Sequence, residues 1–405
     1  MRVLFASHGA APHLYPMVPL AWAFRAAGHE VRLASQTRIR DQLVRCGLPA
    51  FEISGAPQWT DAQRQETVNT IYRQGPWPPR WARDPGALTG AQRAYLEFIG
   101  RRLIATAEAM ADELILIGLA WRPDLIVYDQ ITFAGEVAAA RLGVPAVRHL
   151  CGTVAFPRAE FDATGEPLAE YARLFSSRGL PMVRDPLAWV DMTPPSMRVA
   201  SVPNTVDVRY VPYNGAGTVP DWLAEPARRP RVCVTWGHTA AIALGDEASR
   251  PFLLALEAIA ELDVEIIVVT TAEQIERLTG LPPGTRTAAS APLHLILPYC
   301  DVLVQQGGDG TTLTAASCGV PQLAISRKPD AEVSPGQLAG VGAGIHLRYQ
   351  EIRDDPDAAK IIRTAVERLL SEPRYRDAAR RLRAEIERQP APAEIVPTLT
   401  SLVGG

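Results

Sequence analysis

Residues 302–312 read VLVQQGGDGTT and join a short apolar strand to a glycine-rich loop. The strand at 302–304 leads into the loop, and a helix is expected to begin near Thr311. Glycine lets the backbone approach a ligand, and the first N–H groups of a helix point outward with the positive end of the dipole. This order of elements is typical of the carboxyl edge of a parallel sheet, where α/β proteins bind ligands.

The loop has the glycines and hydroxyls of a phosphate site but no basic residue. It lacks Lys, Arg and His, and it carries the carboxylate of Asp309. It matches neither the phosphate-binding motif G-x-x-x-x-G-K-[ST] nor the dinucleotide-binding motif G-x-G-x-x-G. Backbone N–H groups and the hydroxyls of Thr311 and Thr312 can still bind an anion. The alternative is an ordinary turn with Thr311 as the helix N-cap.

Strand and helix patterns alternate on both sides of this loop. Apolar strands of a first set are expected at 2–6, 31–34, 125–128 and 144–147, with helices at 17–27 and 134–141. A second set is expected at 231–235, 265–270, 295–297, 302–304 and 322–325, with a helix at 251–262. Continuous apolar strands separated by helices predict parallel sheets covered on both faces. The expected fold class is therefore α/β, with two Rossmann-like domains in succession.

The domain boundary is expected at a stretch rich in Gly and Pro, YVPYNGAGTVP at 210–220. The predicted division is an N-terminal domain at 1–212, a linker at 213–228, a C-terminal domain at 229–388 and a final segment at 389–405. A charged amphipathic helix is expected at 374–386. The final segment, broken by Pro390 and Pro392, is expected to cross back to the first domain.

Residues 51–100 fit this alternation poorly. They contain Trp59, Trp77, Trp81, Tyr95 and Phe98 among glycines and prolines. A long irregular segment in an α/β domain is often a binding loop or a lid. The alternative is that these aromatic rings simply pack under the loop.

Length and composition limit the classes of function. With 405 residues, 47% hydrophobic and 21% charged, the chain is globular and long enough for two domains. A net charge of −3 provides no basic field for nucleic acid or acidic membranes. Five scattered cysteines without a C-x-x-C pair predict free thiols in a cytoplasmic protein, without disulfides or a zinc site. No signal peptide is expected, because the apolar run in the N-terminal MRVLFASHG is short and a polar His-Gly follows it. No membrane span is expected, because no apolar run reaches about 18 residues.

Four longer stretches share their residues and their order with one known family. GGDGTTLTAASCGVPQL at 307–323 is similar to the donor-binding signature HHGGAGTTLTALAAGVPQL. The other three stretches are MRVLFASHGAAPHLYPMVPLAWAFRAAGHEVRLAS, PDLIVYDQITFAGEVAAARLGVP and APLHLILPYCD. The chain thus resembles bacterial natural-product glycosyltransferases of the antibiotic and macrolide type, in glycosyltransferase family 1. The resemblance implies the GT-B fold, in which two Rossmann-like domains face each other across a cleft that contains the active site.

The resemblance assigns the chemistry to two residues of the first domain. His13 falls where the family keeps its catalytic base, a role that suits histidine side chains because they titrate near neutral pH. Asp129 matches the carboxylate that orients the base and stabilises the imidazolium. From the residues alone, His8 is an equal candidate for the base, and a cap for the next helix is the alternative role of Asp129.

The donor-side roles are also implied by the resemblance. The diphosphate-binding positions of the family correspond to Gln306, Gly308, Gly310, Thr311 and Thr312. Ser290, Pro292 and Leu293 fall near the nucleotide base, and Asp330 matches the residue that reaches the sugar hydroxyls. The implied reaction is inverting and needs no metal or other cofactor, because helix N–H groups hold the pyrophosphate.

Two donor positions depart from the family pattern through the loss of a ring. Gln306 replaces a phosphate-contacting His, so its amide hydrogen bond lacks charge assistance. Ser290 stands where many relatives have a Trp stacked on the base. Trp236 is a candidate substitute for that ring, and a core position is the alternative for it.

Two further departures concern the sugar. Ala331 stands where many relatives have a Gln beside Asp330, so a partner for one sugar hydroxyl is lost. This predicts a deoxysugar donor. Asp309 replaces a small residue and is expected to point into solvent, because pyrophosphate repels a nearby carboxylate. A sugar hydroxyl or amino group is the alternative partner for Asp309.

Together these residues predict the transfer of a deoxysugar from a TDP-sugar to a hydrophobic, polyketide-like aglycone in antibiotic biosynthesis. The acceptor pocket is expected to be lined by aromatic side chains of the first domain, namely Trp59, Trp77, Trp81 and Phe156. The expected partners are small molecules, and a homodimer is left open. The alternatives are an inactive GT-B homologue that acts as a binding partner, and a nucleotide-sugar 2-epimerase.

Overall fold

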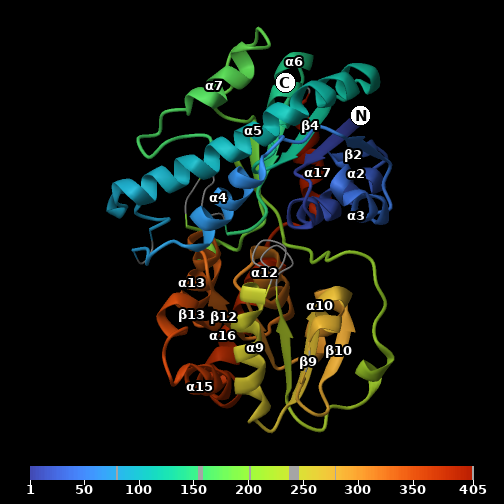
Figure 1. Cartoon of the computed structure of the whole chain (residues 1–405). Helices are drawn as coiled ribbons and strands as arrows, with labels where there is room; N and C mark the ends of the chain where they lie inside the picture. Colours follow the sequence, from blue (N-terminus) through green and yellow to red (C-terminus); the bar gives the residue numbers. More distant parts are fainter. Residues whose placement is uncertain (79–80, 154–157, 200–201, 237–245, 279, 404–405) are drawn as a thin grey trace.

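The computed structural model describes residues 1–78, 81–153, 158–199, 202–236, 246–278 and 280–403, with the backbone alone at 246–249. It contains two parallel sheets, one in each half of the chain. In Figure 1 the first half lies above the second, and the last helix, at the red end of the colour bar, returns to the first half.

The first sheet has seven strands in the order β3-β2-β1-β4-β5-β6-β7, with parallel neighbours. The strands are β1 (Arg2–Ser7), β2 (Glu30–Gln36), β3 (Ala50–Ile53), β4 (Leu125–Asp129), β5 (Ala146–His149), β6 (Ala188–Asp191) and β7 (Thr205–Asp207). Neighbouring residues of β1 enter different cores. Val3 packs in the cluster of α2 (Val18–Ala26), and Leu4 packs in the cluster of α5 (Gly90–Trp121). Helices therefore cover both faces, as continuous apolar strands require.

The second sheet has six strands in the order β10-β9-β8-β11-β12-β13, again with parallel neighbours. The strands are β8 (Arg231–Thr235), β9 (Glu265–Thr270), β10 (Arg286–Ala289), β11 (Val302–Gln305), β12 (Gln322–Ser326) and β13 (Gly344–Arg348). Val232 packs in the cluster of α9 (Asp246–Ala260), and Cys233 packs with α12 (Asp309–Cys318) on the other face. Both halves are thus Rossmann-like, as expected.

The remaining helices connect these strands. They are α1 (Ala11–Leu14), α3 (Arg40–Arg45), α4 (Asp61–Tyr72), α6 (Ala134–Leu142), α7 (Ala169–Ser176), α10 (Ala272–Arg277), α11 (Leu293–Ile296), α13 (Val333–Gly340), α14 (Tyr349–Ile352), α15 (Ala358–Ser371), α16 (Pro373–Arg388) and α17 (Pro392–Ser401). Short 3-10 turns are η1 (Tyr15–Met17), η2 (Thr37–Ile39), η3 (Pro85–Ala87), η4 (Pro195–Met197), η5 (Asp221–Ala224), η6 (Leu297–Tyr299) and η7 (Pro329–Glu332). Within the described ranges, no helix is long and apolar enough to cross a membrane.

The expected strand at 295–297 is wrong. These residues belong to α11 and η6, and the strand of this region is β10. A short apolar run has no periodicity that separates a strand from a buried helical turn, so the run alone could not decide. The short strands β3, β6, β7 and β13 were not expected either, because each contains polar residues.

The expected irregular segment at 51–100 is partly helical. α4 and α5 begin directly after Thr60 and Thr89, and each Thr hydroxyl accepts a hydrogen bond from the backbone N–H three residues later. The reciprocal Gln at that third position completes a capping box, which is a sequence signal for a helix start. Apolar periodicity could not reveal α4, because none of its residues is buried.

The two halves contact each other along several elements. Tyr210, in the segment that connects the sheets, donates its hydroxyl proton to the Gly310 carbonyl at 3.1 Å. Ile395 and Leu399 of α17 lie in the core cluster that contains α2 of the first half. The predicted domain limits at 212, 228 and 388 stay predictions; β7 ends before the first limit and β8 begins after the second.

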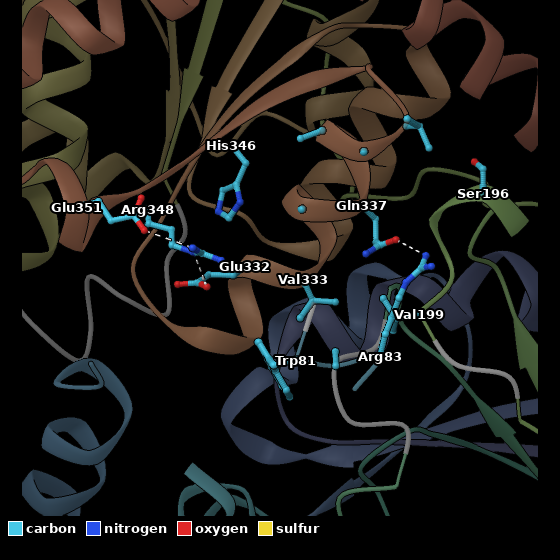
Figure 2. Close-up of a pocket in the computed structure, with 15 residues that line it drawn as sticks. Trp81, Arg83, Ser196, Val199, Glu332, Val333, Gln337, His346, Arg348 and Glu351 are labelled. Carbon is cyan, nitrogen blue, oxygen red and sulfur yellow. Dashed lines mark hydrogen bonds and ion pairs between the residues drawn. The ribbon is translucent and has the colours of Figure 1, made fainter. Parts of the chain in front are cut away.

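A pocket of about 560 Å³ lies at the boundary between the halves. Figure 2 shows Trp81 and Arg83 of the first half on one side of it, and α13 and β13 on the other. Arg348 of β13 pairs with Glu332 at 3.0 Å in its wall. Among the described residues, neither His13 nor Asp129 nor any residue of 302–312 lines this pocket, so it is separate from the predicted catalytic site.

Candidate active site

His13 and Asp129 form a hydrogen-bonded pair at the carboxyl edge of the first sheet. His13 lies in α1, directly after β1, and Asp129 is the last residue of β4, the neighbour of β1. His13 Nδ1 lies 2.9 Å from Asp129 Oδ1. The carboxylate is fully buried, whereas 22% of the His13 side chain is exposed. The pair therefore has one shielded member and one that substrate can reach.

Two backbone N–H groups and one side-chain hydroxyl also donate hydrogen bonds to the Asp129 carboxylate. The N–H of His8 donates to Oδ2 at 2.7 Å, the N–H of Ile131 donates to Oδ1 at 3.2 Å, and the Thr132 hydroxyl donates to Oδ2. Burial alone would raise the pKa of Asp129, but the charge and hydrogen bond of His13, with the Thr132 bond, hold it below its usual value. Asp129 thus stays ionised, and its bonds to Ile131 and Thr132 hold the turn before α6. The alternative role of a helix cap is wrong, because the N-cap of α6 is Phe133 and no side chain caps it.

The local geometry decides between His8 and His13. His8 Nε2 lies 2.7 Å from Arg38 Nη2, and its ring stands edge-on to that of His13. Burial, followed by the charges of His13 and Arg38, lowers the pKa of His8 to about 3. The His8 ring is therefore neutral and is occupied by a guanidinium. Of these two histidines, His13 is the one whose ring bonds a carboxylate, the partner that a catalytic base needs.

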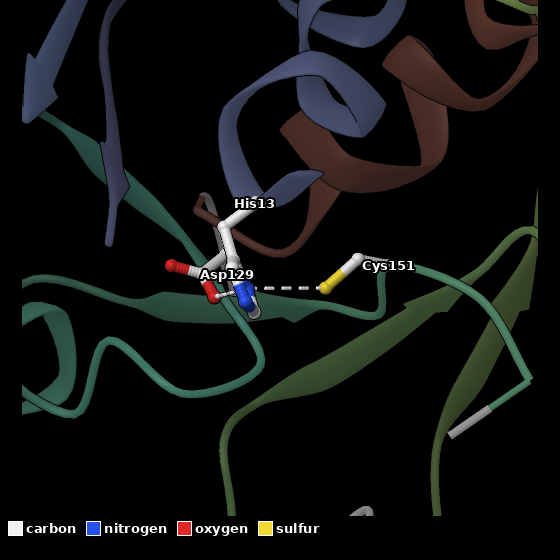
Figure 3. A group of neighbouring side chains, drawn as sticks. All are labelled: His13, Asp129 and Cys151. Carbon is white, nitrogen blue, oxygen red and sulfur yellow. Dashed lines mark hydrogen bonds and ion pairs between the residues drawn. The ribbon is translucent and has the colours of Figure 1, made fainter. Parts of the chain in front are cut away.

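Cys151 is a third member of this cluster that the sequence did not predict. Its Sγ lies 3.4 Å from His13 Nδ1, as Figure 3 shows. Burial, followed by the charges of Asp129 and Asp309, raises the pKa of the thiol well above its usual value, so the thiol stays protonated. The ligand-type atoms of His13, Asp129 and Cys151 lie within 4.8 Å of one another, so a metal ion could bind here; the predicted absence of a metal stays a prediction.

The contacts of His13 determine its tautomer. Asp129 is ionised and can only accept, so Nδ1 carries the proton and donates it to the carboxylate. Nε2 is then the nitrogen with the free lone pair. This is the arrangement in which an imidazole accepts a proton from a substrate hydroxyl.

The conformation of the loop after β11 is fixed by Gln305, a buried glutamine at the end of that strand. Gln305 Oε1 accepts from the N–H of Gly307 at 2.7 Å, and Gln305 Nε2 donates to Thr312 Oγ1 at 2.9 Å and to Gln322 Oε1 at 3.0 Å. Gly307 has φ +102°, and an added Cβ would lie 2.3 Å from the Ala331 carbonyl. The sequence analysis gave Gln305 no role; its signal was an amide inside an apolar strand.

The structure places the five predicted diphosphate residues around the start of α12. Gly308 is the helix N-cap and Thr311 lies half-buried in the first turn. The Thr312 hydroxyl is fully buried and donates to the Gly308 carbonyl at 3.0 Å, so it shapes the loop and is not free for a ligand. This differs from the expectation that both threonine hydroxyls face the ligand. Gln306 Oε1 is buried without a hydrogen-bond partner among the described residues.

The residues predicted near the nucleotide base do not all lie in one place. Pro292 is buried, and its ring fills the space where a Cβ on Gly217 would stand. Leu293 is half-buried in α11, and Ser290 is exposed with φ +52°. Trp236 is a core residue whose ring packs on Phe252, with centroids 5.7 Å apart. Trp236 therefore occupies the core position that was the alternative for it, and the residue is 5% exposed.

The two carboxylates assigned to the sugar, Asp309 and Asp330, are near enough to each other for the charge of Asp330 to raise the pKa of Asp309. Asp330 pairs with Lys328 at 2.5 Å. Asp309 does not point into solvent as expected: an added Cβ on Gly152 would lie 2.5 Å from its Cβ, so its side chain is packed against the loop that follows β5. Gly152 follows Cys151, and the donor loop therefore lies beside the His13–Asp129 pair.

The predicted acceptor aromatics divide into two groups. Trp77 and Trp81 are buried with Tyr95 and, from the second half, Val333. Their packing role is therefore established, and only Trp81 also lines the pocket of Figure 2. Trp59 is half-buried under the Arg102 guanidinium, 3.6 Å from the ring centroid. Phe156 lies outside the described residues.

Family models and known proteins match most of the chain. Residues 22–237 match the family model "Erythromycin biosynthesis protein CIII-like, N-terminal domain", and residues 253–402 match the corresponding C-terminal domain. The chain is 37% identical to the 10-deoxymethynolide desosaminyltransferase of Streptomyces venezuelae, over 99% of this chain and 97% of the relative. It is 36% identical to the aklavinone 7-beta-L-rhodosaminyltransferase of Streptomyces galilaeus, over 99% and 96%. The solved structure of spinosyn rhamnosyltransferase SpnG complexed with thymidine diphosphate matches with a TM-score of 0.81 and 29% identity, over 99% of this chain and 100% of that one.

Proposed function

The chain belongs to the erythromycin biosynthesis protein CIII-like family of bacterial natural-product glycosyltransferases with the GT-B fold, and from this premise we propose its reaction. The proposed enzyme transfers a deoxysugar from a TDP-sugar to a hydrophobic, polyketide-like aglycone, with inversion at the anomeric carbon. The observation that carries this proposal is the His13–Asp129 pair at 2.9 Å, with the donor loop beside it.

The nucleotide is proposed on two grounds. The relative of known structure was solved with thymidine diphosphate, and the start of α12 offers N–H groups and a helix dipole to a diphosphate. The deoxysugar is proposed because Ala331 has no amide to satisfy an additional hydroxyl, and because the named relatives transfer desosamine and rhodosamine.

In the proposed step, Nε2 of His13 accepts the proton of the acceptor hydroxyl while the hydroxyl oxygen attacks the anomeric carbon. The bond from that carbon to the diphosphate oxygen breaks in the same displacement, which inverts the configuration. Asp129 stabilises the imidazolium that forms. The N–H groups of α12 face the negative charge that grows on the leaving diphosphate, and we propose that no metal ion is required for it.

The proposal is tested with a screen of TDP- and UDP-sugars against polyketide aglycones, with the anomeric configuration of donor and product assigned by NMR. We expect transfer from a TDP-deoxysugar with inversion. Retention would contradict the single displacement. Donor isomerisation without transfer would favour a 2-epimerase, and absence of both transfer and TDP binding would favour an inactive homologue.

The base is tested separately. His13→Ala is expected to slow single-turnover transfer by about 100- to 10,000-fold, the usual contribution of general base catalysis. The matched control is His29→Ala, because His29 follows the C-terminal end of α2 and bonds the chain's N-terminus. A His13→Ala rate within a few-fold of that control would remove His13 as the base.

A further inference from the structure

Asp309 adds a carboxylate to a loop whose proposed role is to bind a diphosphate. It is the first residue of α12, at the end where the proposed diphosphate binds, and a carboxylate there repels a phosphate. Its side chain nonetheless lies against Gly152 of the opposite loop. Gly152 adjoins Cys151, whose Sγ lies 3.4 Å from His13 Nδ1. Asp309 therefore lies on the side of the donor loop that faces the proposed base, where the transferred sugar would be held.

The negative charges of Asp309 and Asp330 exceed the positive charge of Lys328 beside them. Asp330 has its counter-ion, Lys328, at 2.5 Å, whereas Asp309 forms no ion pair within 4.0 Å among the described residues. Burial, followed by the charge of Asp330, raises the pKa of Asp309 to about 7, while Ser334 and Lys328 oppose the rise. Two carboxylates thus share one ammonium group. A cation that enters the site would restore neutrality and lower the pKa of Asp309.

Ser334 supplies an independent observation. Its side chain is 1% exposed, and its hydroxyl has no hydrogen-bond partner within 3.5 Å among the described residues. The hydroxyl is nevertheless near enough to Asp309 to lower the pKa of that carboxyl. The hydroxyl therefore faces the Asp309 carboxylate without a close hydrogen bond to it, and a polar group held beside Asp309 would complete its bonding.

We propose that Asp309, with Asp330 and Ser334, forms a subsite for a positively charged amino group on the transferred sugar. The donor would then be an amino-deoxysugar, and this assignment rests on the proposed glycosyl transfer. An ammonium group donates to several acceptors at once and bears the charge that the site lacks. Between the carboxylate and the diphosphate, it also offsets the repulsion between the two anions.

The test compares two TDP-deoxysugars that differ at one carbon, with an amine in one and a hydroxyl in the other. The ratio of their kcat/KM values is measured for wild type and for Asp309→Asn. We expect wild type to favour the amine, and Asp309→Asn to lower the ratio by about 10- to 100-fold, the scale of a lost charge-assisted hydrogen bond. Asp263→Asn makes the same chemical change at a side chain that is 88% exposed, and should leave the ratio as in wild type.

Binding of TDP without sugar, measured by calorimetry, separates the possible outcomes. Asp309→Asn should bind TDP at least as tightly as wild type, because a repulsive charge is removed. A ratio near one in wild type that Asp309→Asn does not change overturns the amino-sugar subsite and leaves the proposed transfer intact. Absence of transfer from either sugar, together with absence of TDP binding, overturns both.

Discussion

An added Cβ on Gly152 would lie 2.5 Å from Cβ of Asp309, so the loop after β5 and the loop after β11 touch beside the His13–Asp129 pair. These two loops belong to different halves of the chain. Real Cβ atoms essentially never approach so closely, and one of the two loops must move if a methyl group is added.

Gly152→Ala is therefore expected to push the donor loop away from His13. We expect kcat to fall by roughly tenfold or more, since small displacements of positioned groups have effects of this size. Single-turnover rates of Gly152→Ala and wild type measure the effect. Equal rates for wild type and Gly152→Ala would show that the contact has no role.

Gly307→Ala should weaken donor binding through the backbone. Gly307 has φ +102°, and its added Cβ would lie 2.3 Å from the Ala331 carbonyl. Strain of about 1–3 kcal/mol is expected to distort the loop and to reduce TDP affinity about tenfold or more. Gly340→Ala is the matched control, because nothing lies within 4 Å of an added Cβ there. Equal calorimetric affinities for the two variants would contradict the prediction.

Gln306→His should restore a charged donor to the loop. The Gln306 amide oxygen is buried without a partner among the described residues, so the side chain is poorly satisfied without ligand. We expect TDP binding to tighten by roughly tenfold below neutral pH, where imidazole is protonated, and by less at pH 8. Gln306→Leu should weaken binding at both pH values. Equal TDP affinities for Gln306→His and Gln306→Leu at both pH values would contradict this prediction.

TDP affinity should depend on pH through Asp309. The pKa of this carboxyl is about 7 in the free protein, and a bound diphosphate raises it further. The bound state therefore holds its proton more tightly, and affinity falls as pH rises through 7. Asp330, Lys328, Ser334 and Cys151 are the groups linked to Asp309.

The comparison with Asp309→Asn isolates this effect, because the titration of the nucleotide is common to both proteins. Calorimetry at pH 6 and pH 8 should give a larger ratio of affinities for wild type than for Asp309→Asn. Equal ratios for the two proteins would assign the pH dependence to the nucleotide alone.

Glu160→Ala should destabilise the first half. Glu160 pairs with Arg148 at 2.6 Å, and both side chains are at most 2% exposed. Loss of Glu160 leaves a buried guanidinium uncompensated, at a cost of about 3–5 kcal/mol in the free energy of unfolding. Glu273→Ala breaks an exposed pair and should cost less than about 1 kcal/mol. Urea titration followed by circular dichroism measures both, and similar costs would contradict the prediction.

Much of the fold could be predicted because most strands are continuous apolar runs. The expected bounds of β8 and β9 equal the observed ones, since both strands have a buried apolar interior and begin and end with a polar residue. α4 could not be predicted in this way, because a helix without a buried residue has no apolar stripe. Its capping box was the available signal.

Site residues could be predicted from the sequence only where they lie in a stretch that resembles the family. Cys151 was missed, although it lies just past the end of β5, next to the strand that carries Asp129. The carboxyl ends of neighbouring parallel strands converge, which is the signal that could have found it. The contact between Gly152 and Asp309 had no signal, because residues of two separate sheets meet there only after the halves dock.

The return of α17 to the first half affects how the halves can move. The chain crosses the boundary near residue 210 and again near residue 390, and Arg209 N donates to the Pro390 carbonyl at 2.7 Å where the crossings meet. Two connecting segments that lie side by side let the halves bend about one axis but resist rotation of one half against the other. Opening and closing of the cleft should therefore follow one direction. The first half, produced without residues 389–405, would leave the apolar face of α2 uncovered and would need that peptide added in trans.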